Sequence, residues 1–223
     1  MRLSIVMPVL DEAAEINAAL AALAPLRAEG HQLIVVDGGS RDGTLAQCRG
    51  LAIEVLQAPR GRASQMNAGA ALAQGEVLLF LHADTRLPGN AGIAIEQAIA
   101  TGAQWGRFDV TIVGRSMMCP VIAALMNLRS RCSSIATGDQ AIFVRRDLFE
   151  RIGGYADLPL MEDIDLCRRL RRRAAPACLR QRVSTSGRRW EQRGVWRTIM
   201  LMWRLRWRYW RGEPAEALAR AYR

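Results

Sequence analysis

Short apolar runs alternate with helical patterns through the first half of the chain. The runs lie at Leu3–Val9, Leu33–Val36, Ile53–Leu56 and Val77–Leu81. Strands that are apolar throughout are typical of a parallel sheet whose two faces are covered by helices. The sequence therefore predicts an α/β fold with a mainly parallel central sheet.

Helices are predicted between and after these runs. Ile16, Leu20 and Leu23 recur at helical spacing, and Arg62–Ala73 is rich in alanine. Glu162–Arg173 has acids in its first turn and arginines in its last, as the helix dipole favours. The remaining expected elements are strands at Trp105–Val113 and Ala141–Val144 and an apolar helix at Met117–Leu128 that is interrupted by Pro120.

The charge is divided unevenly along the chain, which has 223 residues. Residues 1–167 contain 14 Arg against 18 Asp and Glu, whereas residues 168–223 contain 17 Arg against 3 Glu. We expect residues 1–183 to form one main domain and residues 184–223 to be a basic, Trp- and Arg-rich helical extension of it. A tail of this charge points to an anionic partner such as a membrane surface, a phosphorylated acceptor or nucleic acid.

Other features concern the compartment. No apolar run approaches the ~18 residues that cross a bilayer, and the apolar stretch after Met1 is too short for a signal peptide. Five cysteines without metal-ligand spacing are typical of reduced thiols. We therefore expect a cytoplasmic protein.

Acidic residues follow three of the predicted strands. Asp11 and Glu12 follow the first, Asp37 the second and Asp84 the fourth. Ligands of open parallel sheets bind at the carboxyl ends of the strands. These carboxylates are therefore expected to converge on one crevice.

The loop Asp37-Gly38-Gly39-Ser40-Arg41-Asp42-Gly43-Thr44 joins a strand to a helix. Its glycines permit sharp turns and close approach of a ligand. Ser40 or Asp42 would cap the following helix, which leaves Asp37 to accept a hydrogen bond from a base or ribose. An ordinary strand-to-helix turn explains the same residues equally well.

Two further acidic motifs carry candidate chemistry. Asp84 of His82-Ala83-Asp84 would bind Mg²⁺ or Mn²⁺, with His82 as a second ligand; a capping aspartate beside a structural histidine is the alternative. Glu162-Asp163-Ile164-Asp165 opens a helix, so these acids either stabilise its first turn or supply a general base.

In this order, the motifs resemble those of glycosyltransferase family 2, whose members have the GT-A fold, a Rossmann-like three-layer sandwich. Pro8-Val9-Leu10-Asp11-Glu12 is similar to the family's Pro-x-Tyr-Asn-Glu, and the loop at Asp37 is similar to its Asp-Asp-Gly-Ser loop. His82-Ala83-Asp84 stands where the family has Asp-x-Asp, with His82 in place of the first acid. Within the family, the sequence most resembles a small bacterial branch associated with radical-SAM and selenium-related genes and with arsenosugar biosynthesis.

Three more segments extend the resemblance. Arg60-Gly61-Arg62 with Asn67 and Gly69 is similar to the segment that lies under the nucleotide, and Glu162-Asp163 matches the pair that contains the catalytic base. Ser186-Gly187-Arg188-Arg189-Trp190 resembles the Gln-x-x-Arg-Trp motif of related synthases. The resemblance implies nucleotide binding by Pro8, Val9, Glu12, Asp37, Gly39, Arg62, Asn67, Ala83 and Asp84, metal binding by Asp84 and His82, catalysis by Asp163 with Glu162, and acceptor or diphosphate contacts by Asp139, Arg189 and Trp190.

The implied activity is inverting transfer of a sugar from a nucleoside diphosphate sugar, with a UDP-sugar as the expected donor, to an acceptor hydroxyl. The implied cofactor is Mn²⁺ or Mg²⁺. One alternative is a polyprenyl-phosphate sugar transferase at the membrane. Another is a non-enzymatic protein that binds RNA or an anionic surface through its tail, although no nucleic-acid motif is present and no nucleic-acid partner is expected.

The tail contains a stripe of aromatic residues at helical spacing, formed by Trp196, Met200, Trp203, Trp207 and Trp210. Beside it runs a stripe of arginines. Such a helix lies in a membrane interface, which would place the protein on the inner face of the membrane. The alternative, which we favour slightly, is that the tryptophans pack on the catalytic domain and the arginine stems cover its edge.

Overall fold

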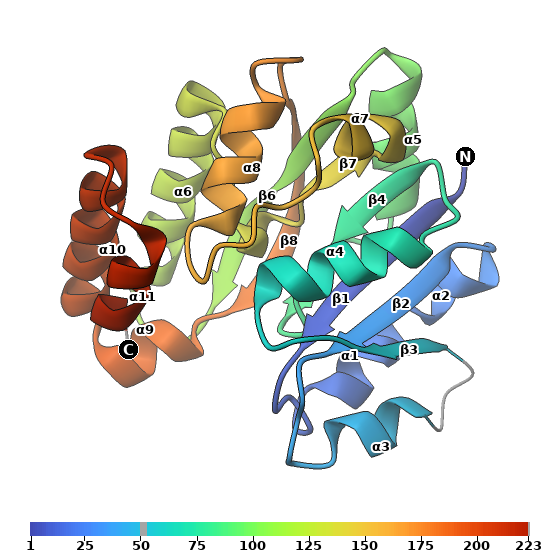
Figure 1. Cartoon of the computed structure of the whole chain (residues 1–223), viewed down its shortest axis with the longest axis horizontal. Helices are drawn as coiled ribbons and strands as arrows, with labels where there is room; N and C mark the ends of the chain where they lie inside the picture. The colour runs from blue at the N-terminus through green and yellow to red at the C-terminus, as the bar shows by residue number, and fades with distance from the viewer. Residues whose placement is uncertain (50–52, 223) are drawn as a thin grey trace.

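The computed structural model describes residues 1–49 and 53–222. Within these residues, an eight-stranded sheet has the order β3-β2-β1-β4-β7-β6-β8-β5 (Figure 1). Its strands are β1 (Leu3–Val9), β2 (Gln32–Asp37), β3 (Glu54–Gln57), β4 (Val77–Phe80), β5 (Thr85–Arg86), β6 (Trp105–Val113), β7 (Phe143–Arg145) and β8 (Ala177–Ser186).

The first four neighbours in this order, β3, β2, β1 and β4, are parallel. Strand β7 then pairs antiparallel with both β4 and β6, while β6 and β8 pair parallel. The short β5 is antiparallel to β8. The prediction of a mainly parallel sheet is therefore confirmed, and the carboxyl ends of β1, β2 and β4 meet at one edge.

Helices cover both faces of the sheet, as the prediction of a three-layer sandwich requires (Figure 1). Five of them contribute to the core on one face: α1 (Ile16–Ala22), α2 (Ala24–Ala28), α3 (Thr44–Arg49), α5 (Ala91–Ala100) and α6 (Cys119–Ser133). The opposite core includes residues of α4 (Arg62–Leu72), α7 (Arg146–Arg151) and α8 (Glu162–Leu170). A 3₁₀ turn at Gly138–Gln140 and helices α9 (Arg188–Arg193), α10 (Val195–Trp210) and α11 (Ala215–Tyr222) complete the described chain.

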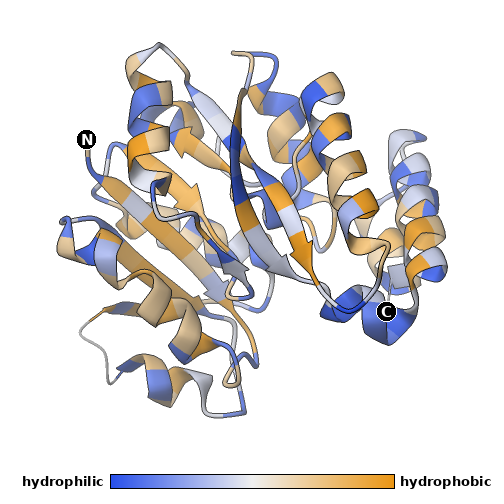
Figure 2. Cartoon of the chain, turned by 180° about the vertical axis from the view of Figure 1, so that it is seen from behind, coloured by the Kyte–Doolittle hydropathy of each residue, from blue (hydrophilic) through white to orange (hydrophobic). Residues whose placement is uncertain are grey.

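Strand β1 shows why its sequence suits a central position. Its residues are all buried, and alternate side chains enter the two cores: Ile5 and Met7 one, Val6 the other. Figure 2 shows the central strands as the most hydrophobic part of the fold. On the Val6 face, a Cβ at Gly69 of α4 would lie 2.5 Å from Val6 and 2.9 Å from Val36, so this glycine lets α4 pack tightly on the sheet.

The same helix ties together the ends of β1 and β2. Gln65 is buried, and its Nε2 donates hydrogen bonds to the carbonyl oxygens of Val9, at 2.8 Å, and Val36, at 2.7 Å. Buried carbonyl groups without a donor are costly. Gln65 therefore fixes the position of the edge at which the candidate site lies.

Replacing Gln65 with Leu is expected to lower the free energy of unfolding by about 1–3 kcal/mol, because the buried carbonyl oxygens of Val9 and Val36 each lose one hydrogen bond. Urea unfolding of the purified variant measures this. The control is Gln97→Leu, at an exposed position of α5, where we expect a change within about 0.5 kcal/mol. Equal effects of the two substitutions would show that the Gln65 hydrogen bonds do not stabilise the fold.

Several local expectations are corrected. Pro120 lies in the first turn of α6, where its missing N–H is tolerated, so it does not interrupt the helix. The pattern at Ile16, Leu20 and Leu23 is divided between α1 and α2, which meet at Leu23. Strand β3 lies at the edge of the sheet and is exposed at both ends rather than fully buried.

Strands β5 and β8 were not predicted. β8 has polar residues at most of its central positions and is only partly buried, so its sequence lacks an apolar run. It also runs across the boundary expected between residues 183 and 184. The helical part of the expected extension begins at Arg188, and its last residue, Arg223, lies outside the described residues.

The aromatic stripe on α10 does not pack on the catalytic domain, so the favoured alternative was wrong. Leu205 lies on the buried side of this helix, where it packs with Leu218 of α11 and with Met161. The side chains of the stripe are more than half exposed: Trp196, Met200, Trp203, Trp207 and Trp210. No helix in the part of the chain that the structure describes is long and apolar enough to cross a membrane.

Candidate active site

Two loops meet at the ends of β1 and β2. The Asp11 carboxylate accepts a hydrogen bond from the Arg41 N–H at 2.8 Å, and the Asp11 N–H donates to Ser40 Oγ at 2.9 Å. Asp42 accepts from the N–H groups of Ala13, at 2.9 Å, and Thr44, at 3.0 Å. Asp42 thus binds the first N–H group of α3, and the loops hold each other in place.

Asp37 lies within this framework rather than in a cavity. Its side chain is fully buried, and its carboxylate accepts hydrogen bonds from the N–H groups of Gly39, at 3.0 Å, and Ser40, at 3.2 Å. Gly39 has a φ of 93°, a conformation that glycine adopts easily. The Asp37 carboxylate thus shapes the loop, and its contact with a base or ribose stays a prediction.

Asn67 is also occupied by the protein. Its Nδ2 donates to the Tyr155 carbonyl at 2.8 Å, and its Oδ1 accepts from the Tyr155 N–H at 2.9 Å. This pair of bonds joins α4 to the glycine turn before α8. Pro8, Val9 and Ala83 are buried at or beside strand ends, and none of them lines either of the two cavities described below.

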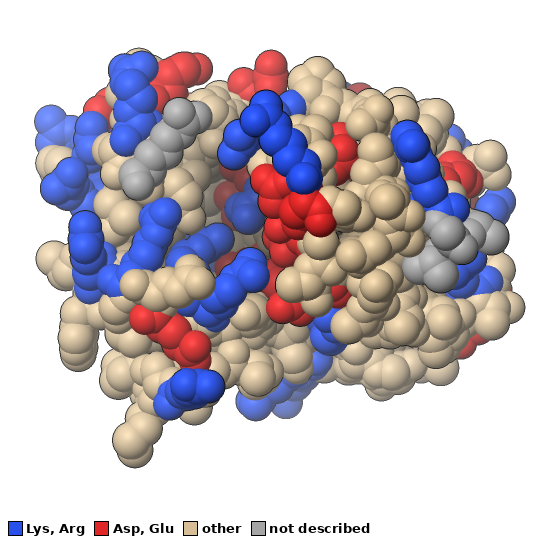
Figure 3. Space-filling view, turned by 90° about the horizontal axis from the view of Figure 1, so that it is seen from below, with Lys and Arg blue, Asp and Glu red and all other residues tan. Residues whose placement is uncertain are grey.

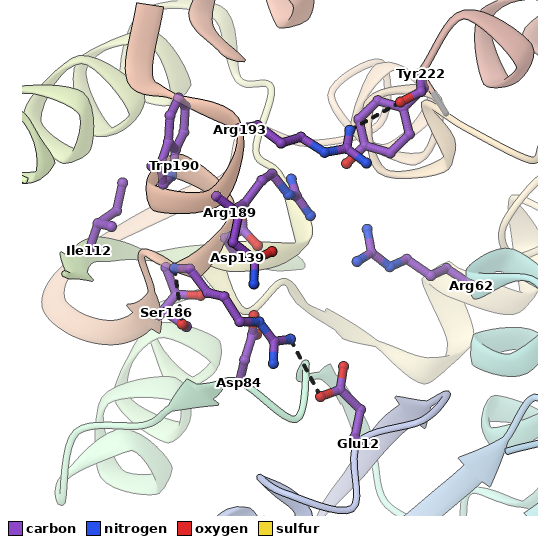
Figure 4. A pocket seen from close by; sticks show the side chains of 13 residues that line it. Glu12, Arg62, Asp84, Ile112, Asp139, Ser186, Arg189, Trp190, Arg193 and Tyr222 are labelled. Atoms are coloured by element: carbon purple, nitrogen blue, oxygen red, sulfur yellow. Dashed lines mark hydrogen bonds and ion pairs between the residues drawn. The ribbon is translucent and has the colours of Figure 1, made fainter. Parts of the chain in front are cut away.

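A polar cavity of about 210 Å³ opens at this edge of the sheet. In the space-filling view from below, arginines and carboxylates gather around a hollow (Figure 3). Arg62 from α4 and Arg189 from α9 point into the cavity from opposite sides (Figure 4). Its other charged lining residues are Glu12, Asp84, Asp139, Arg188 and Arg193.

Two of the three carboxylates that line this cavity, Glu12 and Asp84, accept few hydrogen bonds. Burial raises the pKa of Glu12; the charge of Arg188, 3.8 Å away, opposes this, and those of Asp84 and Glu15 reinforce it. Glu12 Oε2 is buried and accepts no hydrogen bond from any described residue. The Asp84 Oδ1 accepts only the Thr85 hydroxyl, at 3.2 Å, among the described contacts. This part of the cavity therefore has carboxylate oxygens that accept few hydrogen bonds from the protein.

His82 and Asp84 do not line the same cavity. His82 Nδ1 lies 3.6 Å from Asp139 Oδ1, and a Cβ at Gly138 would collide with the imidazole ring. Burial works against ionisation of Asp139, but contact with His82 and the charges of His82, Arg189 and Arg62 outweigh it and hold the pKa of Asp139 well below its usual value. The structure thus pairs His82 with Asp139.

A second cavity, of about 780 Å³, lies between α6, α8 and α10. It shares Arg62, Asp139, Arg189, Trp190 and Tyr222 with the polar cavity. Most of its wall is apolar and comes from α6 and α10, whereas its charged end contains Glu162 and Asp163. The two expected catalytic acids therefore lie where the cavities adjoin.

The two acids have different surroundings. Asp163 accepts hydrogen bonds from the N–H groups of Gly138, at 3.1 Å, and Ile164, at 2.7 Å, which fix its orientation. Glu162 is buried, and its burial raises its pKa, with a further contribution from the charge of Asp163. A carboxylate held in place beside a protonatable neighbour is suited to proton transfer.

The structure thus brings together Glu12, Arg62, Asp84, Asp139, Arg189 and Trp190 around the polar cavity and Glu162, Asp163 and His82 around the apolar one. Sequence reasoning did not assign Arg188, although it belongs to the Ser-Gly-Arg-Arg-Trp motif. It also missed Arg193 and Tyr222, whose carbonyl accepts from Arg193 Nη1 at 3.1 Å. Arg129 and Arg206 of the apolar cavity were missed too, and no motif marks them.

The structure favours a divalent cation at Asp84 without His82, rather than at the expected pair of Asp84 and His82. Within the described residues, no group of three His, Cys, Asp or Glu could hold a metal ion. Mg²⁺ and Mn²⁺ sites that include substrate phosphates commonly use only one or two carboxylates. The unused oxygens of Asp84 and Glu12 meet that requirement, whereas His82 lies against Asp139.

Three solved structures share this fold at low sequence identity. TarS from S. aureus, solved with UDP-GlcNAc, is 19% identical over 83% of this chain, with a TM-score of 0.68. The mannosyltransferase PcManGT from Pyrobaculum calidifontis, solved with GDP-Man and Mn²⁺, is 20% identical over 82% of the chain, with a TM-score of 0.62. Glucosyl-3-phosphoglycerate synthase from Mycobacterium tuberculosis, solved with Mn²⁺ and UDP-glucose, is 18% identical over 81% of the chain, with a TM-score of 0.62.

The present chain spans 58% of the TarS chain, 56% of the PcManGT chain and 69% of the synthase chain. No curated protein matches it in sequence. The fold is the GT-A fold of glycosyltransferases, as expected. Residues 4–104 match the model of the family described as Glycosyl transferase family 2. Its resemblance to one bacterial branch stays a prediction.

Proposed function

We propose that the protein transfers a sugar, with inversion, from a nucleoside diphosphate sugar to an acceptor hydroxyl. The observation that carries this proposal is the pair of adjoining cavities. One is polar and rich in arginine, the other is mostly apolar, and they share Arg62, Asp139 and Arg189. Transfer needs a donor and an acceptor side by side, and this arrangement supplies one cavity for each.

The polar cavity suits the diphosphate of the donor. Arg62, Arg188, Arg189 and Arg193 line it from two sides. Guanidinium groups bind phosphate oxygens in bidentate fashion and stabilise negative charge as it develops on a leaving group. A UDP-sugar is the expected donor, which agrees with the UDP-sugars bound in two of the similar structures.

Asp84, with Glu12 beside it, is the proposed cation site. When bound there, Mn²⁺ or Mg²⁺ would neutralise charge on the departing diphosphate. Mn²⁺ accompanies the donor in two of the similar structures. Asp139 and Arg189, on the shared wall, would orient the donor toward the acceptor.

Asp163 is the proposed general base. It would take the proton of the acceptor hydroxyl as that oxygen forms a bond to the anomeric carbon, on the face opposite the breaking bond to the diphosphate. The electron pair of that bond leaves with the nucleoside diphosphate. One displacement of this kind inverts the anomeric centre. Glu162 would act on Asp163 through its charge and would not itself take the proton.

A screen of nucleotide sugars by thermal unfolding tests the donor assignment. At a ligand concentration 100 times its Kd, binding stabilises the native state by about 2.7 kcal/mol. For a chain of this size, that raises Tm by roughly 5–10 °C, since 1 kcal/mol corresponds to about 2–4 °C. We expect this shift with a UDP-sugar and Mn²⁺. No shift with any UDP- or GDP-sugar would favour a non-enzymatic protein that binds anionic surfaces.

The cytoplasmic location expected from the sequence, with peripheral contact to the inner face of the membrane, stays a prediction. The exposed tryptophans of α10 favour the membrane contact, because large apolar side chains on a surface mark interaction sites.

A further inference from the structure

The apolar cavity has walls that a sugar or another polar acceptor would not need. Ile122, Leu125 and Met126 of α6 face Ile199, Met202 and Trp203 of α10 across it. At about 780 Å³, it is large enough to enclose a chain of many carbon atoms. The acceptor that fills it should therefore have an extended apolar part.

Two arginines interrupt these walls. Arg129 of α6 and Arg206 of α10 both line the cavity. Nε and Nη2 of Arg129 are buried, and no described residue accepts a hydrogen bond from either. Burial and the charge of Arg206 lower the pKa of Arg129 to about 10, and burial also lowers the pKa of Arg206.

Buried donors without partners are costly, and two like charges facing one cavity add repulsion. Neither guanidinium forms an ion pair among the described residues. The nearby carboxylates of Asp139 and Asp163 influence both guanidinium groups through their charges, but without direct contact. An anion with several oxygens, above all a phosphate, would satisfy both arginines at once.

The cavity also opens onto an exposed apolar surface. Leu125, Leu128 and Trp203 line it and are each more than half exposed. The surface continues along the outer sides of both helices, through Met117 and Val121 of the α6 side and Trp196, Met200, Trp207 and Trp210 of the α10 side. Tryptophan beside arginine is typical of a helix in the interface of a membrane.

We propose that the acceptor is an anionic lipid, which enters from a membrane surface between α6 and α10. Its apolar chain lies along the two helices, its phosphate binds Arg129 and Arg206, and a hydroxyl near that phosphate lies beside Asp163. This inference rests on the proposed function, because the bond formed is the one described above: acceptor oxygen to anomeric carbon, with the proton transferred to Asp163 and the nucleoside diphosphate released.

Isothermal titration calorimetry with three probes tests the recognition. The probes are decyl phosphate below its micelle concentration, decanol and inorganic phosphate, each added to the full chain. We expect decyl phosphate to bind at least 10-fold more tightly than either of the others. Equal binding of decanol would overturn the anionic part of the proposal, and equal binding of inorganic phosphate would overturn the lipid part.

Variants locate the site. The double substitution Arg129→Gln with Arg206→Gln should weaken decyl phosphate binding at least 10-fold, whereas Arg204→Gln, at an exposed position of α10, should not. Trp203→Gln should weaken it, whereas Trp210→Gln, which is exposed on the same helix but outside the cavity, should not. Identical affinities in the variants and their controls would remove the site from this cavity.

UDP binding, measured in the same samples, separates this inference from the function on which it rests. If UDP binds but decyl phosphate does not, the lipid acceptor is wrong and the transferase proposal stands. If decyl phosphate binds and no nucleotide does, the cavity binds lipid but the acceptor role is wrong. Sedimentation with phosphatidylglycerol vesicles should also exceed that with phosphatidylcholine vesicles; equal sedimentation with both would contradict recognition of an anionic lipid.

Discussion

Asp163→Asn is expected to reduce the rate of sugar transfer by about 10²–10⁴-fold, the contribution of a positioned general base. The amide cannot accept the acceptor proton at neutral pH. Nucleotide binding should be unchanged, because Asp163 lines the apolar cavity and not the polar one. Release of UDP from the donor measures the rate, with detergent-dispersed membrane lipids and a soluble metabolite extract as two acceptor pools.

The substitution also removes one of two backbone hydrogen bonds, since an amide nitrogen cannot accept from the N–H of Gly138 or Ile164. This should cost about 0.5–1.5 kcal/mol of stability, so Tm is measured alongside. The matched control is Asp165→Asn, on the same helix, where the carboxylate pairs with Arg169 at 2.7 Å and lines neither cavity. Full turnover by the Asp163 variant would exclude it as the base.

Glu162→Gln distinguishes the two acids. The pKa of Glu162 is raised in the folded protein, so its negative charge is complete only above the pH at which an ordinary glutamate ionises. If Glu162 were the base, the rate of the native enzyme would fall as the pH is lowered through this raised pKa, and the Glu162 variant would lose as much activity as the Asp163 variant. We expect the smaller loss for Glu162→Gln.

Asp84→Ala should weaken UDP binding in the presence of Mn²⁺ by at least about 100-fold. Loss of a group that only supports a metal ligand already lowers metal affinity about 10–100-fold, and Asp84 is the proposed ligand itself. Calorimetric titration with UDP, with and without Mn²⁺, measures the effect. The control is Asp157→Ala, an exposed carboxylate that lines neither cavity.

The informative quantity is the difference between the UDP affinity measured with Mn²⁺ and that measured without it. In the native protein, Mn²⁺ should tighten UDP binding, whereas in the Asp84 variant the two affinities should coincide. If UDP binds the variant as tightly as the native protein in Mn²⁺, the cation site lies elsewhere. If His82→Gln lost the Mn²⁺ effect as fully as Asp84→Ala, the pairing of His82 with Asp139 would not describe the protein with its donor bound.

The central strands could be predicted because local sequence alone decides them. The boundaries of β1 and β6 agree with the expected residues, since each strand is a nearly continuous buried run. Strand β8 lies on the outer half of the sheet, and its alternating polar residues leave no such run. Its position depends on pairing with β6, which only the folded chain reveals.

The candidate site could be predicted where a motif follows a strand and not where distant helices meet. The motifs containing Asp84 and Asp163 correctly indicated residues at the cavities. For Asp37, the motif did not show that the loop's own N–H groups donate hydrogen bonds to the carboxylate. Arg129 and Arg206 belong to helices far apart in sequence, so no local pattern could reveal that both face one cavity.

The wall between the two cavities has a thermodynamic consequence. Arg62, Asp139 and Arg189 face both ligands, so whichever ligand binds first changes the charge and the mobility that the second one meets. Linkage requires that this effect be reciprocal: the factor by which the donor changes the acceptor's affinity equals the factor by which the acceptor changes the donor's. If donor and acceptor bind in these cavities as proposed, the affinity of each therefore depends on whether the other is bound.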